Sequence, residues 1–154
     1  MSKSPPVKVR AWRALMHVHA SVTNALDETL QDELGIPGAW YEALIEIAFA
    51  GGMMQMNEFA KEATLTKSGA TRFIDRLEQA GLVERRSCPT DRRVHHLALT
   101  DEGKRLQEAA DPHVLRVLEE TFGRHVTDDE ARIVLAALSR VRIASDHAVE
   151  SHLV

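Results

Sequence analysis

Apolar residues recur every three or four positions over long stretches of the chain, and this spacing predicts a mostly helical protein. The first stretch covers residues 7–34 and carries Trp12, Leu15, His19, Val22, Leu26 and Leu30 at that spacing. Gly35 and Pro37 are expected to end this helix. A second apolar helix is predicted at 38–50, and the run 53–56 is long enough for one short strand.

Two short helices and a β-hairpin are predicted between residues 57 and 99. Asn57 is a suitable N-cap for a helix at 58–64, and Thr66 or Ser68 can cap the next helix, which runs to Ala80. Residues 82–87 and 94–99 read as two strands around a turn at 89–91. The order helix, break, helix, hairpin is the layout of a winged helix-turn-helix.

The C-terminal third is predicted to form two further helices. Thr100 can cap a helix that runs to about Phe122, and Pro112 inside it is expected to bend or break it. Thr127 and Glu130 have the spacing of a capping box and open a last helix.

The helix at 67–80 divides into two faces when its residues are placed 100° apart. Ala70, Phe73, Ile74 and Leu77 fall on one side, as expected for a buried face. The opposite side carries hydrogen-bonding side chains: Lys67, Ser68, Thr71, Arg72 and Asp75. Hydroxyl and guanidinium groups suit base edges and phosphates in a DNA major groove.

Charge is unevenly distributed along the chain. The net charge is −4, but residues 66–93 hold seven Lys and Arg against four Asp and Glu, a local net charge of +3. The rest of the chain therefore carries −7. A basic segment that coincides with the predicted hairpin and polar helix face indicates a contact with nucleic acid.

Other classes of function find less support in the sequence. The single cysteine, Cys88, excludes an intramolecular disulfide, and no phosphate-binding loop or nucleophile elbow suggests an enzyme. No histidine pair has metal-ligand spacing, so neither a metal nor another cofactor is expected. We expect a cytoplasmic protein, because no secretory signal and no membrane-length apolar run is visible.

The stretch LTKSGATRFIDRLEQAGLVERRSCPTDRRVHHLALTDEG (65–103) resembles the signature region of the MarR family of bacterial transcriptional regulators. Asp91-Arg92-Arg93 followed by Leu99-Thr100 and Gly103 is its most diagnostic part. The long N-terminal helix, the helix that contains residues 39–44 and the two C-terminal helices agree with the family as well, so the resemblance covers nearly the whole chain.

The resemblance implies a homodimer of intertwined helices that binds double-stranded DNA at a pseudo-palindromic operator. Residues 1–35 and 101–154 would form the dimerisation region, and 36–100 the DNA-binding domain. The helix at 67–80 would enter the major groove, and Arg93, or alternatively Arg92, the minor groove, with Asp91 orienting an arginine. The expected DNA-contacting residues are Thr66, Lys67, Ser68, Thr71, Arg72, Arg76, Arg92 and Arg93.

Regulation is open to more than one interpretation. MarR-like proteins often bind small aromatic acids or phenols, and Trp12, His19, Trp40 and Tyr41 are the candidate ligand residues. Core or dimer packing is the simpler explanation of the three aromatic residues. Cys88 beside the wing arginines could make the protein redox-responsive. A further alternative is a winged-helix protein-interaction module without DNA binding, whereas the most direct prediction is a repressor released by its ligand.

Overall fold

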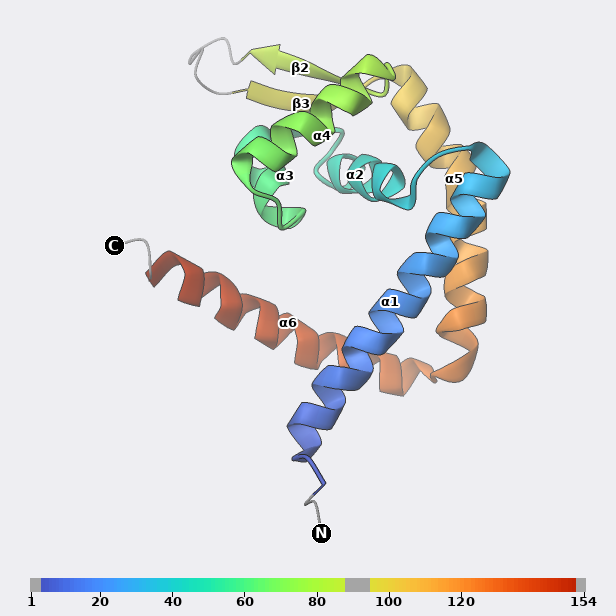
Figure 1. Ribbon diagram of the computed structural model, residues 1–154, viewed down its shortest axis with the longest axis vertical. Helices are drawn as coiled ribbons and strands as arrows, with labels where there is room; N and C mark the ends of the chain where they lie inside the picture. The colour runs from blue at the N-terminus through green and yellow to red at the C-terminus, as the bar shows by residue number, and fades with distance from the viewer. Residues whose placement is uncertain (1–3, 88–94, 152–154) are drawn as a thin grey trace. The chain divides into compact units, whose positions relative to one another are not determined.

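The computed structural model describes residues 4–87 and 95–151, which form two compact units, Met1–Val117 and Leu118–Val154. The chain order is α1 (Val7–Leu34), α2 (Gly38–Phe49), β1 (Met53–Gln55), α3 (Met56–Glu62), α4 (Lys67–Gln79), β2 (Val83–Ser87), β3 (His95–Leu99), α5 (Asp101–Thr121), a 3-10 turn (Gly123–His125) and α6 (Asp128–Ser151). Figure 1 shows α2, α3, α4 and the strands gathered at one end of α1. The predicted mostly helical fold with a small β-sheet is confirmed.

Local interactions explain where α1 ends and α2 begins. Gly35 has a φ of +68°, and its N–H donates to the carbonyl of Gln31 at 3.0 Å. Glycine is suited to this position because it adopts a left-handed conformation without steric cost. The carboxylate of Asp27 accepts the N–H of Gly38 at 2.7 Å. It thereby satisfies a donor at the start of α2 that the preceding Pro37 cannot cap.

The three strands form one antiparallel sheet in the order β1-β3-β2. Leu97 in the central strand pairs with Met54 of β1 and Arg85 of β2, and its side chain is buried. The predicted short strand and the two strands of the hairpin are therefore confirmed, with ends that differ by about one residue.

The core beneath the sheet is built from α2, α3, α4 and the three strands. Its fully buried large side chains include Leu44, Ile47, Phe59, Ile74, Leu77 and Leu97. A second cluster joins α1 to α5 through Leu30, Ile36, Ala110 and Val114, and Trp40 packs against both clusters. These contacts fix one face of α4 and leave its other face outside the core.

The prediction that Asn57 caps α3 is wrong. The helix begins two residues earlier than predicted, at Met56, and Gln55 is its N-cap. The carboxylate of Glu58 accepts the N–H of Gln55 at 2.9 Å, the reciprocal bond of a capping box. Gln55 also pairs with His96, so strand β1 passes directly into the helix.

The two other helix starts agree with the sequence, and one expected interruption does not occur. Thr100 accepts the N–H of Gly103 at 3.0 Å, and Thr127 accepts the N–H of Glu130 at 3.3 Å, so both predicted caps are confirmed. Pro112 does not break α5, which continues from Asp101 to Thr121. Pro112 lies on the exposed side of the helix, while Ala110 and Val114 are buried on the other.

Candidate nucleic-acid interface

Helix α4 has the two faces that its sequence predicts. Ala70, Ile74 and Leu77 are fully buried, and Phe73 stacks on Phe59 with ring centroids 6.1 Å apart. The exposed side carries five of the predicted DNA-contacting residues, namely Lys67, Ser68, Thr71, Arg72 and Arg76. The helix therefore presents a continuous row of polar side chains while its apolar side holds it in the core.

The hydroxyl groups at the start of α4 are partly used within the helix. Thr66 is the N-cap, and its Oγ1 accepts the N–H of Gly69 at 3.1 Å. Thr71 Oγ1 donates to the carbonyl of Lys67 at 2.9 Å. Since its proton is engaged, the outward side of the Thr71 hydroxyl is an acceptor. An acceptor beside a methyl group suits the amino group of adenine or cytosine, or the methyl group of thymine.

The cations on α4 differ in their availability. Lys67 and Arg72 are exposed, and neither forms an ion pair with the part of the chain that the structure describes. The guanidinium of Arg76 lies over the ring of Phe73, 5.5 Å from its centroid. Lys67 and Arg72 are therefore free to meet a phosphate or a base, and Arg76 would have to leave an aromatic contact to do so.

Arg85 on β2 binds the side of α4, a contact that sequence reasoning missed. Its guanidinium donates to Asp75 Oδ1 at 2.6 Å, to Glu78 and to the carbonyl of Thr71 at 3.3 Å. Its backbone N–H donates to Glu78 Oε1 at 3.1 Å. The signal for this contact was present in the sequence, because carboxylates three residues apart lie on one helix face. Arg85 is thus neutralised, and the hairpin is tied to α4.

Arg86, which follows Arg85 on β2, also forms an ion pair, because its guanidinium binds the carboxylate of Glu84. The seven Lys and Arg residues of 66–93 therefore include two, Arg85 and Arg86, whose charge is already paired within the chain. The predicted wing residues Asp91, Arg92 and Arg93, together with Cys88, lie outside the described residues.

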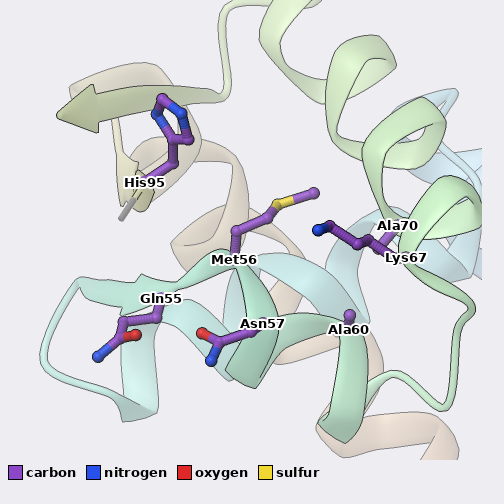
Figure 2. A pocket seen from close by; sticks show the side chains of 7 residues that line it. All are labelled: Gln55, Met56, Asn57, Ala60, Lys67, Ala70 and His95. Carbon is purple, nitrogen blue, oxygen red and sulfur yellow. The ribbon is translucent and has the colours of Figure 1, made fainter. Parts of the chain in front are cut away.

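A cavity of about 510 Å³ lies beside the exposed face of α4, and we call it the α3–α4 cavity. It is lined by Gln55, Met56, Asn57, Ala60, Lys67, Ala70 and His95. Figure 2 shows Lys67 reaching from α4 toward Met56, with Gln55 and Asn57 at the start of α3 and His95 on the neighbouring strand. Lys67 is the lining residue that the sequence analysis predicted as a DNA contact; the other six were not among the predicted site residues.

The four candidate ligand residues do not share one environment within a protomer. Trp40 and Tyr41 pack, half-buried, against the cluster that joins α1 to α5. Trp12 is 58 % exposed and His19 is also exposed. Trp12 is 14 residues before Leu26, the first α1 residue of that cluster, which is about 21 Å along a helix at 1.5 Å per residue.

Tyr41 has a structural partner of its own. Its hydroxyl donates to Asp111 Oδ1 at 2.9 Å, and Asp111 Oδ2 accepts from Gln107 at 2.7 Å. Burial, and then the bond to Asp111, raise the pKa of Tyr41 above its usual value. The phenol is therefore a neutral donor that links α2 to α5.

The described residues hold neither a metal-binding cluster nor a membrane-spanning helix. Residues 4–87 and 95–151 contain no group of three or more His, Cys, Asp or Glu side chains placed to hold a metal ion. Within the same ranges, no helix combines the length and the apolar character needed to cross a membrane.

Comparison with known proteins shows what this arrangement is similar to. A model of the MarR family matches residues 34–94. The transcriptional repressor MprA from Escherichia coli K12 is 28% identical over 141 residues, which cover 89% of this chain and 80% of MprA. The alignment to another curated relative spans 99 residues, 64% of this chain and 60% of that protein.

Solved structures agree over almost the whole chain. AbsC, a MarR family transcriptional regulator from Streptomyces coelicolor, matches with a TM-score of 0.83 and 25% identity, covering 96% of this chain and 99% of AbsC. Sco3205, from the same organism and crystallised in complex with DNA, matches with a TM-score of 0.78 and 25% identity, covering 94% and 91%. The signature residues, the three-stranded sheet and these matches together show that the chain is similar to transcriptional regulators of the MarR family.

Proposed function

We propose that this protein regulates transcription by binding double-stranded DNA sequence-specifically, with α4 in the major groove. The observation that carries the proposal is the exposed face of α4, where Lys67 and Arg72 lack ion-pair partners in the described chain. Ser68 and Thr71 on the same face supply groups that can read base edges. The DNA complex of the relative Sco3205 supports the assignment. Arg93 or Arg92, oriented by Asp91, would enter the minor groove.

Selection of bound sequences from random DNA tests this function. We expect the purified protein to enrich a motif with two inverted half-sites whose centres are about 10 base pairs apart, one helical turn. Arg72→Ala is expected to change or relax the preference at one position of each half-site, since a lost base contact costs about 1–3 kcal/mol. Arg105→Ala is the control, because Arg105 is exposed on α5 and pairs with Glu102.

The same experiment separates DNA binding from the alternative of a protein-interaction module. If the wild-type protein enriches no motif, the DNA-binding proposal is wrong and the interaction module gains support. If a motif is enriched but Arg72→Ala and the corresponding change at Thr71 both return it unchanged, α4 is not the reading helix.

The regulator is proposed to act as a homodimer. Apolar side chains with no cover lie on α1, where Val7, Trp12 and Val18 are exposed, and on α6, where Ile133 and Leu135 are exposed. Apolar surface of this extent on helices is the usual mark of an association surface. We accordingly assign 1–35 and 101–154 to dimerisation and 36–100 to DNA binding.

Repression and ligand control are the finer parts of the proposal. The name of the relative MprA supports repression. A small aromatic acid or phenol would bind near Trp40 and Tyr41, with Trp12 or His19 brought near by dimerisation. Such a ligand would release DNA if it favoured a distance between the two DNA-binding domains that does not match the operator. Titration of benzoic and phenolic compounds against the protein–operator complex tests this. Compounds that bind the free dimer but leave operator affinity unchanged would contradict ligand control.

A further inference from the structure

The α3–α4 cavity has both polar and apolar side chains in its lining. Its polar lining comes from Gln55, Asn57, Lys67 and His95, and none of the described residues that line it is a carboxylate. Met56, Ala60 and Ala70 form its apolar part. An ammonium, an imidazole and two amides in one lining can all donate hydrogen bonds. This composition favours an anion that is attached to an apolar body.

The polar side chains of the cavity are available for such an anion. Lys67 and His95 are exposed, and neither makes an ion pair with another residue in the ranges 4–87 and 95–151. Asn57 is also exposed, and its side chain makes no hydrogen bond with the described part of the chain. Beside Lys67, the first N–H groups of α4 have no carbonyl partner within the helix, which favours a negative charge there.

The cavity is continuous with the proposed DNA-reading surface. Lys67 belongs to both, because it lines the cavity and begins the exposed face of α4. His95 begins the strand that returns from the wing. DNA seated on α4 would therefore place its backbone, an alternation of deoxyribose and phosphate, next to the opening. The volume of about 510 Å³ exceeds the needs of a single phosphate and falls within the range of about 300–1,000 Å³ of small-ligand sites.

We propose that the α3–α4 cavity receives one deoxyribose-phosphate unit of the DNA backbone. Asn57, Lys67 and His95 hold the phosphate, and the sugar packs on the partly exposed side chains of Met56 and Ala60. Asn57 and His95 are thus positioning contacts that fix the register of α4 on the duplex without reading bases. This inference rests on the proposed DNA-binding function and adds a second anchoring point, outside the exposed face of α4.

The test uses Asn57→Asp in the full-length protein. A carboxylate in place of the amide keeps the shape of the side chain but repels the phosphate. We expect affinity for the operator and for unrelated duplex DNA to fall by a similar factor, about tenfold. Asp in the first turn of a helix is favourable, so the melting temperature should not fall. His95→Gln is expected to weaken both affinities in the same sense, by a smaller factor.

A matched control and a change in the DNA make the test specific. Asn24→Asp alters the net charge identically at an exposed position of α1 outside the cavity lining, and it should leave binding unchanged. Single methylphosphonates, which remove the charge of one phosphate, are then scanned along the operator. One position should weaken the wild-type protein and have a much smaller effect on Asn57→Asp.

The outcomes separate this inference from the function on which it rests. If the wild-type protein enriches no DNA motif, the proposed function itself is wrong. Normal wild-type binding combined with equal behaviour of Asn57→Asp and Asn24→Asp, or with a methylphosphonate scan identical in both proteins, would overturn the cavity assignment. Sodium benzoate is the last probe. If it shifts the Asn57 side-chain amide resonance while the scan stays flat, the cavity holds a free organic anion instead of the DNA backbone.

Discussion

At the scale of single residues, what matters at this interface is the charge that remains after local pairing. Asp75 and Glu78 lie on α4 beside the reading face, where carboxylates would repel phosphates. The guanidinium of Arg85 binds both and also the carbonyl of Thr71. Arg85 thereby masks two negative charges next to the proposed DNA path and holds the hairpin against the helix. Its contribution to binding is expected to be indirect.

The loss of operator affinity caused by replacing Arg85 should be reversed when the carboxylates that Arg85 masks are also replaced. We predict that Arg85→Gln lowers operator affinity about tenfold, because two carboxylates then face the DNA. Adding Asp75→Asn and Glu78→Gln should restore affinity to within about threefold of wild type. Fluorescence anisotropy at two salt concentrations measures this. A triple variant that binds no better than Arg85→Gln would mean that the ion pairs themselves, and not charge masking, sustain binding.

Thr64 is the one described non-glycine residue with a positive φ, 53°, and it lies in the turn between α3 and α4. A β-branched side chain is strained in this left-handed conformation, whereas asparagine tolerates it. We predict that Thr64→Asn raises the free energy of unfolding by about 1 kcal/mol. Thr64→Val, which keeps the β-branch, should bring no gain in urea unfolding. Equal stability of the two variants would remove the strain argument.

At the scale of helices and strands, periodicity and caps predicted most of the fold. The bounds of α1 agree with the predicted 7–34, because its apolar pattern repeats over many turns and Gly35 ends the helix. The caps at Thr66, Thr100 and Thr127 are confirmed for the same reason, since a hydroxyl three residues before a free N–H is a local signal. The start of α3 was misplaced because Gln55 both pairs in the sheet and begins the helix, and strand pairing is not local.

Gly103 near the start of α5 illustrates a constraint that sequence periodicity could not reveal. A Cβ atom built at this position would lie 2.0 Å from the carbonyl oxygen of Leu82. In an open helix, Gly→Ala stabilises by about 1 kcal/mol. Here we predict that Gly103→Ala lowers the free energy of unfolding by about 2 kcal/mol, because α5 must move away from the strand that follows Leu82.

Urea unfolding of Gly103→Ala beside Glu108→Ala checks this prediction. Glu108 is exposed on the same helix, so its replacement should change stability by less than about 0.5 kcal/mol. A stabilised Gly103→Ala protein would show that the backbone of Leu82 yields at little cost.

At the scale of the whole molecule, the sequence predicted the exposed polar face of α4 but not which apolar residues a single chain covers. Trp40 and Tyr41 are half-buried between clusters, whereas Trp12 of the same predicted ligand set is exposed. Burial depends on which helices pack together, and periodicity identifies an apolar face without identifying its partner. The cavity residues Asn57 and His95 escaped prediction because they are brought together by the fold across 38 positions of sequence.

The apolar residues of α6 lead to the prediction for the assembly. Ile133 is 69 % exposed in the protomer, and Val141, two turns further along the same stripe, is exposed as well. A second copy of the chain would bury this stripe in the proposed homodimer. A charge at Ile133 should therefore oppose association without disturbing the fold of the protomer, whereas deletion of 130–154 would remove the whole helix and should abolish the dimer.

We predict that Ile133→Glu sediments as a monomer at micromolar concentration and keeps its helical circular dichroism. It should lose tight operator binding, because a monomer has one DNA-binding domain and contacts one half-site. Ile133→Val, which keeps an apolar side chain at the same position, is the control and should remain dimeric. Because Ile133 is exposed in the protomer, unfolding is not expected to account for a loss of affinity. A dimeric Ile133→Glu protein would remove this stripe from the interface. A monomer with undiminished operator affinity would show that the paired DNA-binding domains are not needed for binding.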